Sequence, residues 1–194
     1  MDWYDDDVVL FRPSPAHCQE VISKLEDRHQ KITLDNSSPD SVLLLLPAIL
    51  QRPTVRKLAI EYTPLPHDCI LSLSYLLARN TSLEKLSLIF SSISDEGVAA
   101  LCHALQNNSK LTHLLLHDNP LITSNSAQAL AQLLLNNSTL SFLSLVHTSL
   151  SSDAVVPLLD ALTTNKTLKG LSLDKQTCST YPKYHLIEDR LYFK

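Results

Sequence analysis

Residues 111–116 read Leu-Thr-His-Leu-Leu-Leu, with leucine at the first, fourth and sixth positions. This LxxLxL spacing recurs along the chain at intervals of 28 or 29 residues. The matching stretches begin at Val55, Leu83, Leu140 and Leu168, and a weaker one, Ile32-x-Leu34, precedes them. A fixed period of this length indicates a repeat protein in which each unit is one small structural element.

Each unit divides into a strand and a helix. Leu86 and Leu88 alternate with polar residues, which predicts a short strand. After the strand, Val98, Leu101 and Leu105 recur at helical spacing. We therefore expect an α/β solenoid with six short parallel strands on its concave face and helices on its convex face. The strands should centre on Ile32–Leu34, Leu58–Ile60, Leu86–Leu88, Leu114–Leu116, Leu143–Leu145 and Leu171–Leu173.

The repeat units resemble leucine-rich repeats of the 28-residue, ribonuclease-inhibitor-like type. Such repeats also form the sensor regions of nucleotide-binding innate immune receptors and occur in Ran GTPase activators. The resemblance covers about residues 30–178 and implies a horseshoe-shaped solenoid that binds partners on its concave face. One family position, commonly Asn or Cys, departs from the pattern, because it holds Thr63, Ser91, Asn119, Thr148 and Gln176. Short hydroxyl side chains can still bond to the turn backbone there, whereas Gln176 makes the last unit less regular.

Both ends of the chain differ from the repeats, as the ends of a solenoid must if its leucines are to be covered. Residues 1–30 are expected to form an N-terminal cap with one helix, which starts at Ser14-Pro15 and runs to about Arg28. Residues 31–178 hold about five to six repeats. Residues 179–194 are expected to form a C-terminal cap, with a docking peptide for another protein as the alternative.

Composition excludes several classes of function. The chain has 16 Lys and Arg against 20 Asp and Glu, a net charge of −4, which argues against a nucleic-acid-binding protein. Its only two glycines, Gly97 and Gly170, are too few for a Walker-type loop or a GxGxxG motif. We expect no cofactor.

The sequence favours a cytoplasmic location. The longest apolar block, residues 42–50, contains Pro47 and is far shorter than the ~20 residues that span a membrane, so no membrane contact is expected. Four cysteines without CxxC or metal-ligand spacing predict free thiols in a reducing compartment: Cys18, Cys69, Cys102 and Cys178.

Six N-x-S/T sequons argue for a secreted protein instead, at Asn36, Asn80, Asn107, Asn136, Asn137 and Asn165. Their positions point to another explanation. An asparagine stands three residues before each repeat-opening leucine, at Asn80, Asn108, Asn137 and Asn165. Asparagine in such a place is typical of a turn.

No group of residues predicts catalysis or a metal site. His113 and His117 lie four residues apart, but on a strand this distance is ~13 Å, too long for one metal ion. Asp118 and His147 occupy equivalent positions in adjacent units and are expected to form a surface contact. We therefore expect a protein that is not an enzyme.

The side chains that alternate with the buried leucines remain as candidates for function. In the middle units they are apolar, aromatic or histidine, a composition typical of protein-binding hot spots. The predicted partner-binding residues are Tyr62, Ile89, Phe90, His113, Leu115, His117, Phe142, Val146 and His147. The alternative is that the ends or loops of the protein cover some of them.

These observations predict a non-enzymatic protein-interaction or ligand-sensing module. It would act alone or as the sensing part of a larger innate-immune-type receptor. One alternative is a GTPase activator of the Ran-directed kind, although the tail here lacks the strong acidity of those proteins. Another is a protein inhibitor of a nuclease, which the mixed charge of the predicted concave face disfavours.

Overall fold

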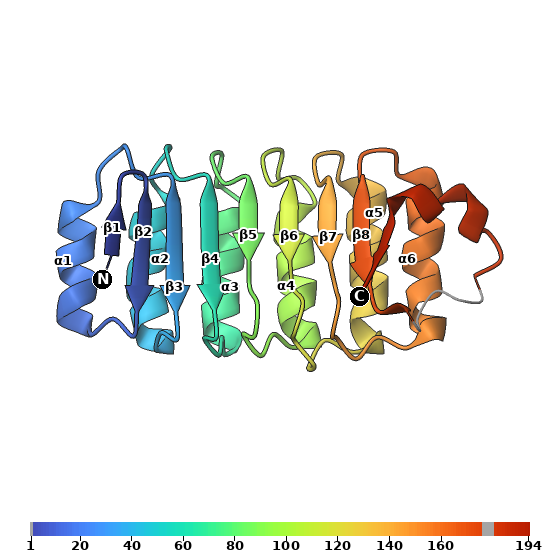
Figure 1. The fold of residues 1–194 in the computed structure, drawn as a ribbon, viewed down its shortest axis with the longest axis horizontal. Helices are drawn as coiled ribbons and strands as arrows, with labels where there is room; N and C mark the ends of the chain where they lie inside the picture. Colours follow the sequence, from blue (N-terminus) through green and yellow to red (C-terminus); the bar gives the residue numbers. More distant parts are fainter. Residues whose placement is uncertain (1, 176–180) are drawn as a thin grey trace.

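Nine strands in the described part of the chain form one sheet in which strand order follows chain order (Figure 1). The computed structural model describes residues 2–175 and 181–194. The first strand is antiparallel to the second, and strands β2 to β9 are parallel to their neighbours. The strands are β1 Asp2–Tyr4, β2 Asp7–Phe11, β3 Lys31–Asp35, β4 Lys57–Glu61, β5 Lys85–Ser87, β6 His113–Leu115, β7 Phe142–Ser144, β8 Gly170–Leu173 and β9 Leu191–Phe193. The prediction of six parallel strands at the leucine motifs is confirmed by β3 to β8.

Six α-helices of the described residues lie on one side of this sheet (Figure 1). They are α1 Pro15–Lys24, α2 Pro39–Leu50, α3 His67–Leu77, α4 Asp95–Leu105, α5 Ala127–Asn136 and α6 Ser152–Thr164. Four of them begin at a serine whose hydroxyl accepts a hydrogen bond from a backbone N–H of the first turn: Ser14, Ser38, Ser94 and Ser151. Single-turn helices η1 (Ser124–Ser126), η3 (Tyr184–Leu186) and η4 (Glu188–Arg190) complete the connections.

The repeated leucines stack into a continuous core between the sheet and the helices. Pairing in register places Leu58, Leu86, Leu114, Leu143 and Leu171 side by side on successive strands, and all five are buried. Each leucine therefore touches equivalents on the units before and after it, so stability comes from nearest-neighbour contacts between units.

A ladder of asparagines holds the turns that follow the helices. The amide nitrogen of Asn137 donates to the carbonyls of Leu105 (2.8 Å) and Asn108 (3.0 Å) in the preceding unit. Its oxygen accepts from the backbone N–H groups of Thr139 (2.8 Å) and Leu140 (2.7 Å). The same four bonds recur at Asn108 and Asn165. Asn80 makes three of them, and its amide nitrogen donates a further bond to the hydroxyl of Ser82 (3.3 Å). The turn role predicted for these asparagines is confirmed.

Arg190 ends this ladder. Its Nη2 donates to the carbonyl of Leu162 (2.8 Å) and its Nη1 to that of Asn165 (2.7 Å). These two carbonyls are equivalent in the repeat to those of Leu105 and Asn108, to which Asn137 donates. The guanidinium of Arg190 therefore takes the place of a further asparagine. The residue next to Arg190 begins β9, which extends the sheet.

A second set of polar side chains holds the turns that follow the strands. Asn119 accepts hydrogen bonds from the backbone N–H groups of Ser91 (3.0 Å) and Ile93 (3.1 Å) and donates to the carbonyl of Leu88 (2.7 Å). At the equivalent position Thr63 accepts from the N–H of Ser37 (2.9 Å). The short side chains at this position bond to the turn backbone, as predicted. Gln176 lies outside the described residues.

The N-terminal segment contains more structure than the sequence predicted. Strands β1 and β2 form a hairpin, and β2 continues the parallel sheet before the unit of Leu34. Helix α1 begins after Ser14 as predicted but ends at Lys24 rather than near Arg28. Asp7, part of an acidic run, forms an ion pair with Lys31 (2.8 Å).

The cysteines Cys18, Cys69 and Cys102 are buried as free thiols. Burial raises the pKa of Cys102 to about 12. Cys178 lies outside the described residues. None of the helices described is both long and apolar enough to cross a membrane.

We predict that Asn137→Ala lowers the free energy of unfolding by about 1–3 kcal/mol, because two buried carbonyls and two N–H groups lose their partner. The neighbouring Asn136 is exposed and is the matched control. Asn136→Ala should change the free energy by no more than about 0.5 kcal/mol in urea denaturation. Equal effects of the two substitutions would contradict the ladder.

Candidate protein-binding site

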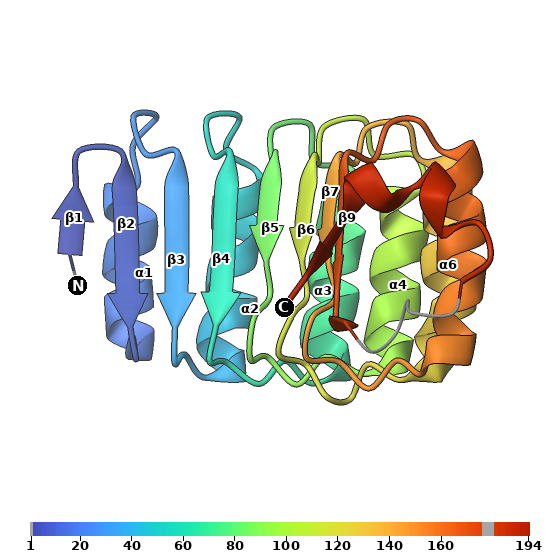
Figure 2. The ribbon, with the colours of Figure 1, turned by 45° about the vertical axis from the view of Figure 1, so that its right-hand side comes forward.

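The face of the sheet opposite the helices carries no covering layer over most of its length. Figure 2 shows β1 to β5 widely spaced and β6 to β9 crowded together, so the sheet curves with its bare face on the inside. Successive side chains of a strand point to opposite faces, so the residues between the buried leucines project from this concave face. All the predicted partner-binding residues come from these strands or from the residues just after them.

Pairing in register arranges the concave side chains in rows across the strands. One row runs from Lys31 through Lys57 and Lys85 to His113 and Phe142. The next row contains Ala59, Ser87 and Leu115. Together the rows line a groove of about 460 Å³. The groove residues are Lys31, Lys57, Leu58, Ala59, Glu61, Lys85, Leu86, Ser87, Ile89, His113, Leu115 and Phe142.

The groove brings together four of the predicted binding residues, Ile89, His113, Leu115 and Phe142. Burial, with a smaller contribution from the charge of Lys85, lowers the pKa of His113, so this ring is neutral at neutral pH. Three lysines, Lys31, Lys57 and Lys85, also line the groove, although they were not among the predicted binding residues. Their recurrence at one position of successive units was the available signal.

Tyr62 and Phe90 lie beside the groove, directly after its residues Glu61 and Ile89. Both have a left-handed backbone, with φ of 49° and 51°. Their rings stack with centroids 4.8 Å apart and planes 11° from parallel, yet 54% and 45% of these side chains stay exposed. The same left-handed backbone recurs at this turn in other units, at Arg12, Asn36, Asp118 and His147, so it is a feature of the repeat.

Asp118 and His147 follow Tyr62 and Phe90 at the same left-handed position, with φ of 59° and 55°. The expected contact is present, since Nδ1 of His147 lies 2.7 Å from Oδ1 of Asp118. The backbone N–H of His147 also donates to both carboxylate oxygens of Asp174 at 3.1 Å. His147 is exposed, but its partners fix its orientation.

Phe142 is held in place rather than free in solvent. Its ring is half-buried between His113, with centroids 5.9 Å apart, and Tyr192 of β9, at 6.1 Å. Gly170 provides the room, because a Cβ there would lie 2.6 Å from Cδ2 of Phe142. Phe142 therefore offers only part of its ring to a partner.

The prediction that Val146 is accessible to a partner is wrong. The alternation rule predicted an outward, accessible side chain, but Val146 is only 4% exposed. The end of the chain lies in front of this part of the concave face (Figures 1 and 2). The charge of Lys194, the last residue, also acts on His117.

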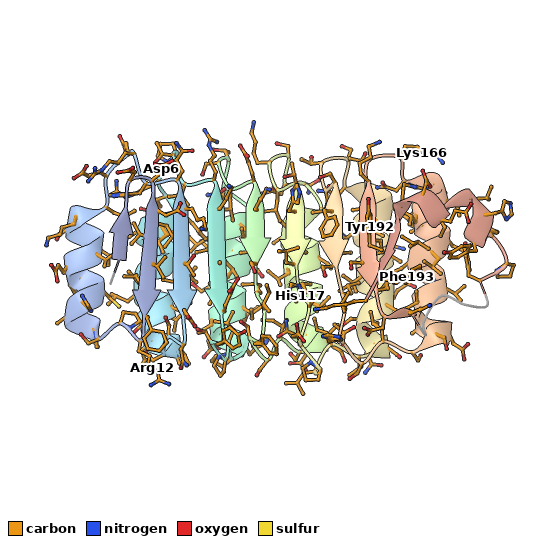
Figure 3. The ribbon with its side chains drawn as sticks, viewed as in Figure 1. Asp6, Arg12, His117, Lys166, Tyr192 and Phe193 are labelled. Carbon is orange, nitrogen blue, oxygen red and sulfur yellow. The ribbon has the colours of Figure 1, made fainter. Side chains whose placement is uncertain are left out.

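His117 is half-buried under this chain end. Figure 3 shows Tyr192 and Phe193 on the same side of the sheet as His117. Burial is the main cause that lowers the pKa of His117, although the nearby carboxylate of Asp118 acts in the opposite direction. His117 and Val146 therefore belong to the covered part of the concave face, and the groove belongs to its open part.

The arrangement of strands and helices has counterparts among solved structures. A structure of the tropomodulin C-terminal domain from Caenorhabditis elegans matches with a TM-score of 0.61 and 14% sequence identity, over 76% of this chain and 90% of that one. The fold is similar to that of the tropomodulin C-terminal domain. The leiomodin-1 actin-binding site 2 also matches, with a TM-score of 0.56 and 21% identity over 65% of this chain and 74% of that one. No known sequence family and no curated protein matches the chain.

This likeness corrects the family expected from the sequence. The likeness found is to tropomodulin and leiomodin domains, rather than to the ribonuclease-inhibitor-like sensor regions of immune receptors that the sequence led us to expect. The physical reason is that LxxLxL fixes a strand, a buried leucine pair and a stacking direction. These features are local to each unit, and they do not determine the family in which the units occur.

We predict that Gly170→Ala destabilises the protein by about 1–3 kcal/mol, because the added methyl group pushes against the ring of Phe142. Ser172→Ala on the same face of β8 is the control and should change the free energy of unfolding by less than about 0.5 kcal/mol. Urea denaturation measures both. A Gly170→Ala protein as stable as the control would mean that the ring does not lie over Gly170.

Proposed function

We propose that the chain is a non-enzymatic protein-binding module that holds its partner on the open part of the concave face. The observation that carries this proposal is the Tyr62–Phe90 pair, two stacked and half-exposed rings. Exposed aromatic anchors beside an apolar groove are typical of binding hot spots. The groove of Ile89, Leu115 and Phe142 supplies the adjacent apolar surface.

The proposed mechanism is complementarity of shape and charge, with no chemical step. The face is built on short strands of a stacked solenoid, so its side chains are fixed before the partner arrives, which reduces the entropy cost of binding. The buried thiols of Cys18, Cys69 and Cys102 fit a reducing compartment, and we place the module in the cytoplasm. The site gives no reason to assign it to a receptor rather than to a free-standing protein.

Actin is the first specific partner to test. The observation that favours it is the likeness of the fold to a domain described as an actin-binding site of leiomodin-1. Sedimentation with actin filaments and titration with monomeric actin test this candidate. If it is right, Tyr62→Ala/Phe90→Ala should lose most of the binding.

The general proposal is tested by capture of proteins from the native source on three immobilised forms of the chain. These are the unaltered protein, Tyr62→Ala/Phe90→Ala, and the control Leu71→Ala/Tyr75→Ala. The control removes an exposed aromatic and an exposed aliphatic residue from α3 on the convex side, where Tyr75 is 62% exposed.

We predict that a partner retained by the unaltered protein and by the control is lost from the Tyr62→Ala/Phe90→Ala form. Calorimetric titration with this partner should show at least about 30-fold weaker binding, since a truncated aromatic anchor costs 2 kcal/mol or more. Thermal melts should show that all three forms are folded. Loss of binding in the convex control alone would place the interface on the helices and contradict the proposal.

A further inference from the structure

The lysines of the groove form a column that is neutralised only at one end. Lys31, Lys57 and Lys85 pair in register on adjacent strands, which places their positions ~4.8 Å apart. Lys31 has a carboxylate partner, Asp7, at 2.8 Å. In residues 2–175 and 181–194, no ion pair engages Lys57 or Lys85.

The two unpaired lysines have no role in holding the fold together. Both side chains are exposed, and like charges on facing positions of adjacent strands destabilise a sheet. The next residue in the row, His113, carries no negative charge that could offset theirs. The column therefore repels itself in the free protein, and a carboxylate over Lys57 and Lys85 would relieve the repulsion.

The acidic side chains on the same face are engaged or lie away from the column. Glu61, four residues beyond Lys57, accepts a hydrogen bond from the hydroxyl of Ser87 (3.0 Å). Asp118 is bonded to His147. Positive charge thus stands at one end of the groove, and Ala59, Ile89 and Leu115 supply apolar surface next to it. Glu61 lines the end toward Tyr62.

Resting on the proposed function, we infer that the groove takes an acidic segment of a protein partner, with carboxylates over Lys57 and Lys85 and an apolar side chain over Ile89 and Leu115. Such a segment complements both the charge and the apolar surface. A phosphate backbone fits less well, because it offers no apolar side chain to Ile89 and Leu115 of the groove.

The test is selection of short random peptides displayed on phage against the immobilised, otherwise unaltered chain. The charge-reversal form is Lys57→Glu/Lys85→Glu. The matched control, Lys110→Glu/Lys166→Glu, changes the net charge equally at two exposed lysines outside the groove, and Figure 3 shows Lys166 at the edge of the fold. A single-stranded oligonucleotide serves as the competing probe.

We expect the selected peptides to be rich in Asp and Glu around an apolar residue. Fluorescence anisotropy with a synthetic selected peptide should show binding that weakens by about tenfold or more in Lys57→Glu/Lys85→Glu but not in the control, and that falls as salt rises. Tyr62→Ala/Phe90→Ala should also weaken it.

The other outcomes separate the two proposals. Neutral or basic peptides that bind in a Tyr62- and Phe90-dependent way would overturn the acidic-segment inference and leave the binding face intact. A failure to select any peptide, or binding unaffected by either double substitution, would count against both. The oligonucleotide could instead bind more tightly than the selected peptide and lose this binding in Lys57→Glu/Lys85→Glu. The ligand of the groove would then be a nucleic acid and not an acidic segment of a protein.

Discussion

Every connection between consecutive parallel strands in the repeats crosses on the same side of the sheet, and this constraint organises the whole molecule. A parallel pair needs a crossover, and right-handed crossovers along a sheet whose strands follow chain order place all helices on one face. The helices cover Leu86, Leu114 and their equivalents. The opposite face is left open, and it can be covered only by a partner or by the ends of the chain.

Stacking of the units also requires that the backbone N–H and carbonyl groups of each turn find hydrogen-bond partners in the neighbouring unit. The ladder through Asn137 and the turn set through Asn119 meet this need without water, since each amide bonds to backbone groups of the unit before it. Arg190 closes the ladder at the last helix, and β9 then covers one end of the concave face. The same tail therefore ends the ladder and limits the candidate binding surface to the groove and the Tyr62–Phe90 pair.

The sequence was most informative where a residue type repeats and least informative where a contact depends on chain ends. Leucine spacing predicted β3 to β8 because burial of an alternating pair defines a strand. Strands β1 and β2 were missed because only Val8 and Leu10 alternate there, beside an acidic run that looks solvated.

For the site, alternation alone does not account for the exposure of Tyr62 and Phe90, because each comes one residue after an outward position, in a turn with left-handed backbone. Alternation predicted Val146 wrongly, since this side chain at an outward position is only 4% exposed.

The central claim is that the partner occupies the open concave face, and side-chain footprinting with hydroxyl radicals tests it most directly. Tyr62 and Tyr75 are nearly equally exposed, at 54% and 62%, but lie on opposite sides of the molecule. With the captured partner bound, the account predicts strong protection of Tyr62 and Phe90 from oxidation and unchanged oxidation of Tyr75. Protection of Tyr75 with Tyr62 and Phe90 still reactive would contradict it.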